Sequence, residues 1–245
     1  MDNGSIARMD TQNGAGIYEG LDLSSWKNGW EPGAPVFTGY EGEVEAIERK
    51  YPAKDFADMP LRTVFYGASN FRKWKNMDAD LKEFGVQNHG FGGATDVLLV
   101  HYADRLLFPY APDVAVIQSG SNDYAGLKGK PARQAAASLE LKRRMYGYFL
   151  ENLPDTRFVL LSPLLMPGAP YFTETSLLVS EGMVDICRDI PRLCFTDVAG
   201  LTYNGGEYRT ELFVSDGIHL NRNGQLALKD IVEEVLHGIF EDIRS

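Results

Sequence analysis

The stretch "VFYGASNFRKW", residues 64–74, joins a run of apolar residues directly to a polar segment with helical character. The β-branched and aromatic residues of 61–67 predict a buried strand that ends at Gly67. The chain therefore passes from strand to helix within Gly67, Ala68 and Ser69. This turn has two interpretations. It is either an ordinary strand-to-helix connection, or it holds Ser69 as a nucleophile at the edge of a sheet.

The same alternation of strand and helix continues along the rest of the chain. Four further apolar runs predict strands, and segments with helical periodicity separate them. Such an alternation is typical of an α/β domain with a parallel sheet covered by helices on both faces. The predicted strands are 61–67, 86–91, 113–119, 157–163 and 193–197, and the predicted helices are 40–51, 71–84, 95–107, 131–153, 173–189 and 224–240.

The composition is that of a globular protein with an acidic surface. The chain has 245 residues, and 34 acidic against 24 basic residues give a net charge of -10. This charge disfavours nucleic acids and anionic membranes as partners. The sequence has neither an apolar run long enough for a membrane helix nor the apolar core of a signal peptide. We therefore expect a cytoplasmic protein in which Cys187 and Cys194 are free thiols.

The first 39 residues differ from the rest of the chain. They are rich in small and polar residues and show no clear period, yet they contain several aromatic residues, among them Trp26 and Trp30. A disordered tail seldom holds so many aromatic side chains. We therefore expect residues 1–39 to form an extension that packs on the main domain, residues 40–245.

Small and polar residues follow the predicted strands. Ser69 follows the first strand, Gly93 lies in a glycine-rich segment after the second, and Asn122 follows the third. Asp216 and His219 lie just before the last predicted helix. In parallel α/β sheets, ligands bind beyond the carboxyl ends of the strands. Four separate segments are therefore expected to bring these residues to one edge of the sheet.

These residue types suit acyl transfer. A serine hydroxyl needs a base to take its proton, and histidine is the side chain most often used for that purpose. A carboxylate must hold the imidazole in the correct tautomer, and the spacing of Asp216 and His219 allows this on a tight turn. The oxyanion that develops needs hydrogen-bond donors. The candidates are the backbone N–H groups of Ser69 and Gly93 and the side-chain amide of Asn122.

Each residue also has an ordinary structural interpretation. Ser69 alone is most simply a turn residue, and Asn122 with Asp123 could form a turn or cap a helix. The glycines around Gly93 could form a tight turn. The joint placement of all these segments at the ends of predicted strands favours a hydrolase. His89 lies close enough to the predicted edge to be considered as a pocket residue.

Other classes of enzyme fit the sequence less well. The glycines of 90–95 only approximate a dinucleotide-binding Gly-x-Gly-x-x-Gly and follow the second strand instead of the first. An α/β-hydrolase would carry Gly-x-Ser-x-Gly, but Phe71 stands at the last position. The four histidines and two cysteines show no metal-ligand spacing. We therefore expect neither a cofactor nor a metal.

Four blocks of the sequence resemble those of the SGNH hydrolases, also called GDSL-type esterases and lipases. They read "YGASNF", "NHGFGGAT", "GSNDYA" and "SDGIHLN", in the family's order, and the resemblance covers roughly residues 40–241. The Phe-x-x-Trp after the serine and the "GGAT" are most similar to the branch of platelet-activating-factor acetylhydrolase subunits. The resemblance implies a flavodoxin-like three-layer α/β/α sandwich with a five-stranded parallel sheet.

The resemblance also implies roles for individual residues. Ser69 would be the nucleophile, and His219 and Asp216 would complete a Ser-His-Asp triad. The oxyanion donors would be Ser69, Gly93 and Asn122.

One residue departs from the family pattern. The family's Gly-Asp-Ser reads Gly-Ala-Ser here, with Ala68 at the aspartate position. That aspartate is not the triad acid, so we expect the chemistry to survive. The departure removes a side chain that could hydrogen-bond the backbone of the nucleophile turn and so support it locally.

The implied activity is that of a serine esterase which hydrolyses a small-molecule ester through an acyl-enzyme. We expect short, acetyl-type acyl groups, with an acylated carbohydrate as one candidate substrate, because no lipid-binding device is visible. The alternatives are a lysophospholipase or thioesterase that takes longer acyl chains, and an SGNH fold used only for binding. The expected partners exclude nucleic acid and membrane, and a homo-oligomer is left open.

Overall fold

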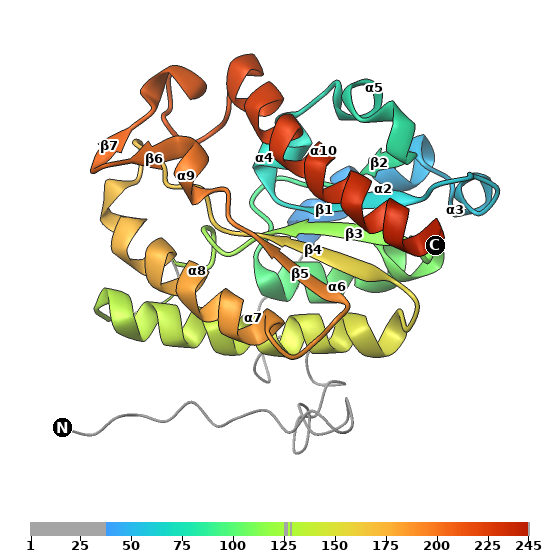
Figure 1. Ribbon diagram of the computed structural model, residues 1–245, viewed down its shortest axis with the longest axis horizontal. Coiled ribbons are helices and arrows are strands. Elements are labelled where there is room, and N and C mark those ends of the chain that lie inside the picture. Colours follow the sequence, from blue (N-terminus) through green and yellow to red (C-terminus); the bar gives the residue numbers. More distant parts are fainter. Residues whose placement is uncertain (1–37, 125–126, 128, 245) are drawn as a thin grey trace.

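The computed structural model describes residues 38–124, 127 and 129–244 (Figure 1). The aromatic residues of the predicted N-terminal extension lie outside these ranges, so the packing of that extension stays a prediction. Within the described ranges, no helix is both long and apolar enough to cross a membrane.

The centre of the domain is a five-stranded parallel sheet with the order β2-β1-β3-β4-β5 (Figure 1). This is the flavodoxin-like order of a doubly wound sheet, and it confirms the predicted fold. All five predicted strands are present, and each is shorter than its sequence pattern indicated. The strands are β1 (Thr63–Gly67), β2 (Val86–Asn88), β3 (Val114–Gln118), β4 (Arg157–Leu161) and β5 (Leu193–Thr196).

Alternate residues of the central strands enter two separate hydrophobic cores, because successive side chains of a strand point to opposite faces. In β1, Val64 and Tyr66 belong to one core, whereas Phe65 belongs to the other. The buried residues of β3 and β4 alternate between the same two cores. Both faces of the sheet are therefore apolar, as expected for a sheet covered by helices on both sides.

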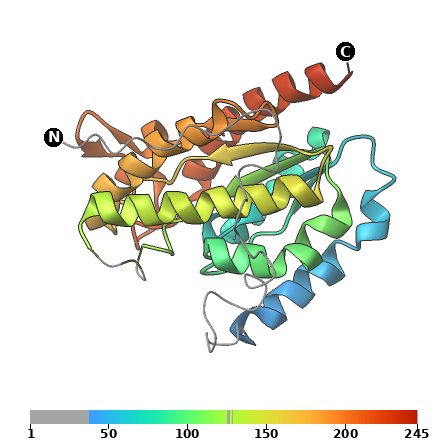
Figure 2. The ribbon, with the colours of Figure 1, turned by 90° about the horizontal axis from the view of Figure 1, so that it is seen from below.

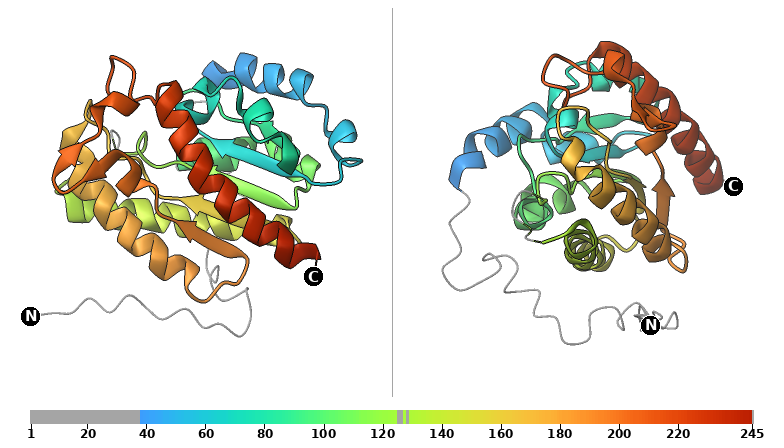
Figure 3. Two further views of the ribbon diagram at one scale, coloured as in Figure 1. Left: turned by 45° about the horizontal axis from the view of Figure 1, so that its top comes forward. Right: turned by 90° about the vertical axis from the view of Figure 1, so that its left-hand side faces the viewer.

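Helices form the two outer layers. One layer contains α6 (Asp96–Leu106), α7 (Pro131–Asn152) and α8 (Thr173–Cys187), and α2 (Glu41–Lys50) packs on α6 (Figure 2). The other layer contains α4 (Ser69–Lys73), α5 (Met77–Asp80) and the long α10 (Arg222–Arg244), which lies across the sheet (Figure 3). This arrangement confirms the predicted three layers.

The prediction of one continuous helix over residues 71–84 is wrong. The segment instead forms α4, α5 and a 3-10 turn at Lys82–Phe84. The break lies at Trp74, where the Asn88 side-chain amide donates to the carbonyl oxygens of Phe71 and Trp74 at 2.7 and 3.2 Å. Both carbonyls therefore accept hydrogen bonds from a side chain of β2, and the helix ends at this point.

The sequence pattern missed several elements of two to four residues, which are too short to show a period. α3 (Ala53–Phe56) precedes β1. α9 (Ala199–Thr202) and the two-stranded sheet of β6 (Tyr203–Asn204) and β7 (Glu207–Tyr208) lie between β5 and α10. Further 3-10 turns lie at Thr38–Tyr40, Phe108–Tyr110, Pro170–Phe172 and Thr210–Leu212.

Candidate active site

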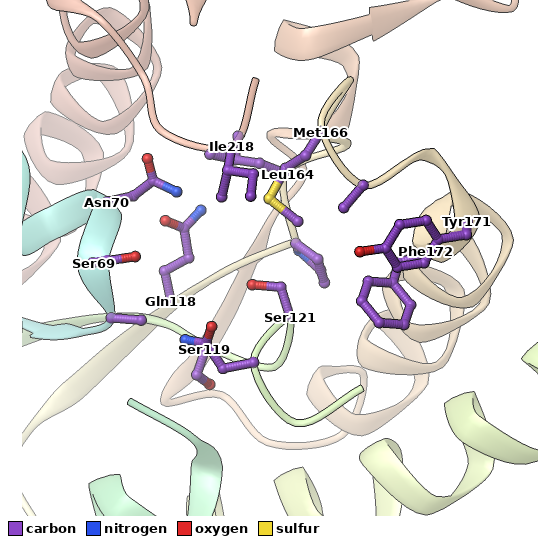
Figure 4. Close-up of a pocket in the computed structure, with 14 residues that line it drawn as sticks. Ser69, Asn70, Gln118, Ser119, Ser121, Leu164, Met166, Tyr171, Phe172 and Ile218 are labelled. Carbon is purple, nitrogen blue, oxygen red and sulfur yellow. The ribbon is translucent and has the colours of Figure 1, made fainter. Parts of the chain in front are cut away.

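Ser69 is the first residue of α4 and follows β1 after a single residue, Ala68. Ala68 has an extended backbone (φ -96°, ψ -157°), and its carbonyl accepts the N–H groups of Phe71 and Arg72 at 3.1 and 3.2 Å. The strand therefore stops and the helix starts around one residue. As a result, the Ser69 hydroxyl lies at the carboxyl edge of the sheet, beside a cavity (Figure 4).

Asp216 and His219 lie on a tight turn before α10. One carboxylate oxygen of Asp216, Oδ1, accepts the N–H groups of Ile218 and His219 at 2.8 and 2.9 Å. Gly217 has φ +65°, and a Cβ there would lie 2.7 Å from the backbone nitrogen of Gly168. Only glycine fits both constraints. The turn leaves the second carboxylate oxygen, Oδ2, beside the imidazole ring.

The His219 ring bridges Asp216 and Ser69. Its Nδ1 lies 2.7 Å from Asp216 Oδ2, and its Nε2 lies 2.9 Å from Ser69 Oγ. With Nδ1–H donating to the carboxylate, Nε2 is free to accept the hydroxyl proton. The structure thus brings together three predicted residues, although Ser69 and His219 are 150 positions apart.

Asp216 is held in its ionised form. Desolvation acts to raise the pKa of this carboxyl, but hydrogen bonds from the His219 ring and from the N–H groups of His219 and Ile218 outweigh it. The net result is a pKa well below the ordinary value of an aspartate. Asp216 can therefore orient a neutral imidazole and stabilise an imidazolium.

A hydrogen bond connects the turn that carries His219 to Asn70, the residue after Ser69, and so holds this turn close to the start of α4. The backbone N–H of Leu220 donates to Asn70 Oδ1 at 3.0 Å. Asn221 then starts α10, because its side-chain oxygen accepts the N–H of Gly224 at 3.1 Å. Sequence reasoning missed the contribution of Asn70, since its partner lies 150 residues away and no spacing indicates it.

Of the remaining predicted donors, Asn122 lines the same cavity as Ser69, whereas Gly93 does not. The Asn122 side-chain amide donates one hydrogen bond to the Ala94 carbonyl at 2.9 Å. Gly93, with φ +68°, lies one residue from that contact. The structure therefore places Asn122 in the same cavity as Ser69 and places Gly93 outside the cavity lining, one residue before the Ala94 carbonyl that Asn122 contacts.

Two charged residues from different helices hold the glycine-rich segment in place. Glu43 of α2 accepts the N–H of Gly92 at 2.8 Å and also pairs with Arg72 of α4 at 2.9 Å. α2 therefore supports the site as well as the core, since it links the segment after β2 to the helix that begins with Ser69.

A buried ionic cluster lies behind the segments that carry Gly93 and Asn122. Lys142 of α7 and Asp96, the first residue of α6, have fully buried side chains, with Nζ 3.2 Å from Oδ2. Lys142 also donates to the carbonyl and hydroxyl of Ser119, and Asp123 accepts the Asp96 N–H at 3.1 Å. The cluster therefore ties α6 and α7 to the loop after β3.

The electrostatics of the cluster depend on burial. Burial raises the pKa of Asp123 well above its usual range; the Asp96 carboxylate acts in the same direction, and Lys142 opposes it. Gly120 allows the close packing, because it has φ +113° and a Cβ there would lie 2.9 Å from Lys142 Nζ. A sequence signal existed, since Lys142 stands on the buried face of its predicted helix, where an unpaired lysine is rare.

The suggestion that His89 lines a pocket is wrong. Its side chain is fully buried, its Nδ1 lies 2.6 Å from the Leu106 carbonyl oxygen, and its ring packs against Tyr110. Burial lowers its pKa to about 4, although the hydrogen bond to Leu106 opposes this. His89 is therefore a neutral core residue.

The cavity beside Ser69 has a volume of about 200 Å³ (Figure 4). One wall is polar and carries Gln118 and Ser121, from the end of β3 and the loop after it. Tyr171 lies at the far end with 70% of its surface exposed. The other wall is apolar and contains Leu164, Met166, Phe172 and Ile218.

One possible metal-ligand group lies among the described residues, away from this cavity. Ligand atoms of Glu83, Glu233 and His237 lie within 4.8 Å of one another. Lys229 pairs with Glu233 at 2.5 Å, and the His237 ring packs against Phe84. None of the five lines the cavity beside Ser69, so the group is not part of the candidate site.

Several solved structures share this fold. A Streptococcus pneumonia protein described provisionally as a platelet activating factor is 18% identical, with a TM-score of 0.65 over 80% of this chain and 93% of that chain. A GDSL-like lipase from Bacteroides thetaiotaomicron is 17% identical, with a TM-score of 0.58 over 89% and 99%. A lipase/acylhydrolase from Enterococcus faecalis is 17% identical, with a TM-score of 0.54 over 72% and 96%. At these identities the likeness establishes the fold alone.

Comparison by sequence identifies the family. No curated protein matches the chain. A family model described as the GDSL-like Lipase/Acylhydrolase family matches residues 63–227, which is more than half of the chain and spans the segments that carry Ser69, Asn122, Asp216 and His219. The chain belongs to the GDSL-like lipase/acylhydrolase family.

Proposed function

We propose that this protein is a serine esterase that cleaves short-chain esters through an acyl-enzyme. The observation that carries the proposal is the His219 ring, which contacts Ser69 Oγ at 2.9 Å and Asp216 Oδ2 at 2.7 Å. A base that touches both a hydroxyl and a carboxylate is the arrangement that activates a serine. Membership of an acylhydrolase family supports the same reaction class.

In the proposed mechanism, Ser69 Oγ attacks the carbonyl carbon of the ester while His219 Nε2 takes the hydroxyl proton. The tetrahedral intermediate collapses, and the same proton passes from Nε2 to the leaving alcohol. A water molecule then attacks the acyl-enzyme and gives its proton to Nε2. Release of the carboxylic acid returns the proton to Ser69.

The carbonyl oxygen becomes negatively charged in both steps and needs donors that are already in place. Asn122 has two amide N–H groups, and the bond to Ala94 uses one of them. We assign the second N–H to the oxyanion, together with the backbone N–H of Ser69 at the start of α4. The third donor in our proposal is the backbone N–H of Gly93, because the carbonyl of its neighbour Ala94 accepts the hydrogen bond from Asn122.

The size and lining of the cavity support a small acyl group. A volume of about 200 Å³ is smaller than the roughly 300–1,000 Å³ of most sites for drug-sized ligands. We propose acetyl to butyryl groups, held against the apolar wall that contains Leu164 and Met166. Tyr171 is exposed at the end of the cavity, where an aromatic ring can stack on a sugar ring, and we therefore retain an acylated carbohydrate as a candidate substrate.

Covalent labelling tests the proposed nucleophile. A fluorophosphonate probe should modify Ser69, and peptide mass mapping should find the label on the peptide that contains it. Ser69→Ala should abolish the label, and Ser121→Ala, which changes another serine of the same cavity, should retain it. A folded wild-type protein that stays unlabelled and inactive would favour the binding-only alternative.

A series of p-nitrophenyl esters tests the acyl size. We expect kcat/KM to be highest for acetate or butyrate and to fall for octanoate and palmitate, measured below their aggregation thresholds. Each methylene that fits a pocket contributes up to ~0.8 kcal/mol, so a long-chain hydrolase should gain steeply with length. A rise in kcat/KM through octanoate would replace this proposal with the lysophospholipase or thioesterase alternative.

A further inference from the structure

A lysine touches the candidate triad on the side away from Ser69. Lys73, the last residue of α4, places its Nζ 3.0 Å from His219 Nδ1 and 3.8 Å from Asp216 Oδ2. The helix explains this position, because Ser69 and Lys73 are four residues apart and lie on one face of α4. The same short helix therefore presents a hydroxyl to one ring nitrogen of His219 and an ammonium to the other.

The short distance to Asp216 decides the nature of the Lys73 contact. Nδ1 and Oδ2 are 2.7 Å apart, a separation that requires a proton between them. Nδ1 is then a donor and has no lone pair for an ammonium, which is itself only a donor. The interaction between Lys73 and the ring is therefore electrostatic and unfavourable to positive charge on the ring.

The charges around the ring are few. Among the described residues, the charged side chains in contact with His219 are Asp216, from its own turn, and Lys73, from α4. The other ring nitrogen faces the neutral hydroxyl of Ser69. The negative charge of Asp216 favours the imidazolium that forms when His219 takes a proton. The positive charge of Lys73 opposes the imidazolium directly, and it also offsets part of the negative charge of Asp216.

We propose that Lys73 is a positioning residue that keeps His219 unprotonated, and so active as a base, to lower pH than the Ser-His-Asp arrangement alone would allow. This inference rests on the proposed function, because it assigns a role within the same reaction. The lysine side chain is 43% exposed, so its field is weakened by water but not removed.

The pH dependence of kcat/KM for p-nitrophenyl acetate tests the inference. Lys73→Met should move the midpoint of the acid limb to higher pH by about 0.5–1 unit at low salt, as expected for a unit charge 3–4 Å away in a water-like dielectric. Lys73→Arg should largely restore the wild-type limb, because it keeps the charge. The shift should shrink at high salt, since the pair is exposed.

A matched control is available in the same segment. Lys75 is also exposed and lies two residues further on, and Lys75→Met removes the same charge without touching His219. Its acid limb should superimpose on that of the wild type. Equal shifts in the two variants, or no shift in Lys73→Met, would overturn the inference while leaving an active esterase and the proposed function intact.

A second measurement does not depend on activity. The titration of the His219 ring, followed by NMR of the ring carbons in Ser69→Ala protein with and without Lys73→Met, should show a higher midpoint when the lysine is absent. An unchanged midpoint would overturn the inference even if the protein proved not to be an esterase. Failure of both labelling and hydrolysis in the wild type would instead reject the proposed function.

Discussion

The two halves of the candidate site contain the same kind of ion pair in opposite surroundings. On the histidine side, Lys73 and Asp216 lie 3.8 Å apart, with side chains 43% and 39% exposed. On the side that carries Asn122, Lys142 and Asp96 lie 3.2 Å apart, and neither side chain is exposed at all. Each pair is connected to the candidate site. Lys73 contacts His219, and Lys142 donates a hydrogen bond to Ser119 in the loop after β3.

The difference teaches what each pair is able to do. Water and salt screen an exposed pair, so it contributes little to folding, but its charges can still adjust the reactivity of a neighbouring ring. A buried pair interacts in a low dielectric, and loss of one partner leaves an uncompensated charge in the core. We therefore expect the exposed pair to affect the proposed reaction and the buried pair to affect the fold and the positions of the proposed oxyanion donors.

The largest expected effect comes from breaking the buried pair. Lys142→Met should lower the free energy of unfolding by about 3–5 kcal/mol, because Asp96 would lose its charged partner while its side chain stays buried. Urea denaturation at neutral pH measures this. The double variant Asp96→Leu/Lys142→Met should recover most of the loss, since it removes both charges.

Lys73→Met provides the matched comparison for that experiment. It should change the free energy of unfolding by less than about 1 kcal/mol, as is usual for one partner of an exposed pair. Similar losses for Lys73→Met and Lys142→Met would show that burial does not distinguish the two pairs, and the comparison would fail.

The next largest effect is expected at Asn122, on the side of the candidate site that contains the buried pair. Asn122→Ala should lower kcat by about 10²–10³ with a smaller change in KM, because in the proposed mechanism the amide acts mainly on the charge of the transition state. The variant should remain folded, as judged by its denaturation midpoint. If KM alone rises, Asn122 binds the ground state of the substrate, and its assignment as an oxyanion donor is wrong.

A third effect, similar in free energy to that expected for Asn122→Ala, concerns the stability of the fold at acid pH. His89 has a pKa of about 4 in the folded protein against about 6.5 when exposed, so between these values the unfolded state binds more protons. Its contribution is fully present above pH 6.5 and is lost as the pH falls toward 4, by about 3 kcal/mol in total.

Urea denaturation at several pH values between 7 and 4.5 measures this loss. His89→Gln should show a shallower fall in the free energy of unfolding than the wild type, because the buried imidazole is removed. If His89→Gln retained the full slope, other groups would be responsible for the acid sensitivity.

The smallest effect is expected at the departure from the family motif. Ala68→Asp should change kcat/KM by no more than about tenfold, or ~1.4 kcal/mol, because the proposed mechanism takes the carboxylate of the triad from Asp216. Steady-state kinetics on p-nitrophenyl acetate measures the change, with Ala68→Asn as the uncharged control. A fall of several orders of magnitude in Ala68→Asp alone would mean that a charge beside Ser69 disturbs the reacting groups.

The structure also separates what local sequence patterns predict from what they cannot. The five strands were predicted because each is a continuous apolar run, and a doubly wound sheet needs such runs. The positions of Ser69, Asn122, Asp216 and His219 followed, since the carboxyl ends of parallel strands share one edge. The structure brings Ser69, Asp216 and His219 into contact and places Asn122 in the same cavity.

Other features depended on contacts between distant segments, and the sequence patterns missed them. The helix break at Trp74 follows from a bond to Asn88, and the role of Asn70 follows from a bond to Leu220. His89 was placed near the edge by its position after a strand, but the packing of α6 buries it. In each case a residue close in sequence to a correctly predicted element acquired its surroundings from another part of the chain.

By itself, the sequence determined the order of the elements, the edge of the sheet where the polar residues gather and the identity of the residues that could react there. These depend on periodicity and on the ends of strands, which are local properties of the chain. Only the tertiary structure decided which charges meet. Lys73 and Lys142 are both helical lysines, yet one lies in water beside His219 and the other in the core beside Asp96, because helix packing sets the dielectric and the partner of each.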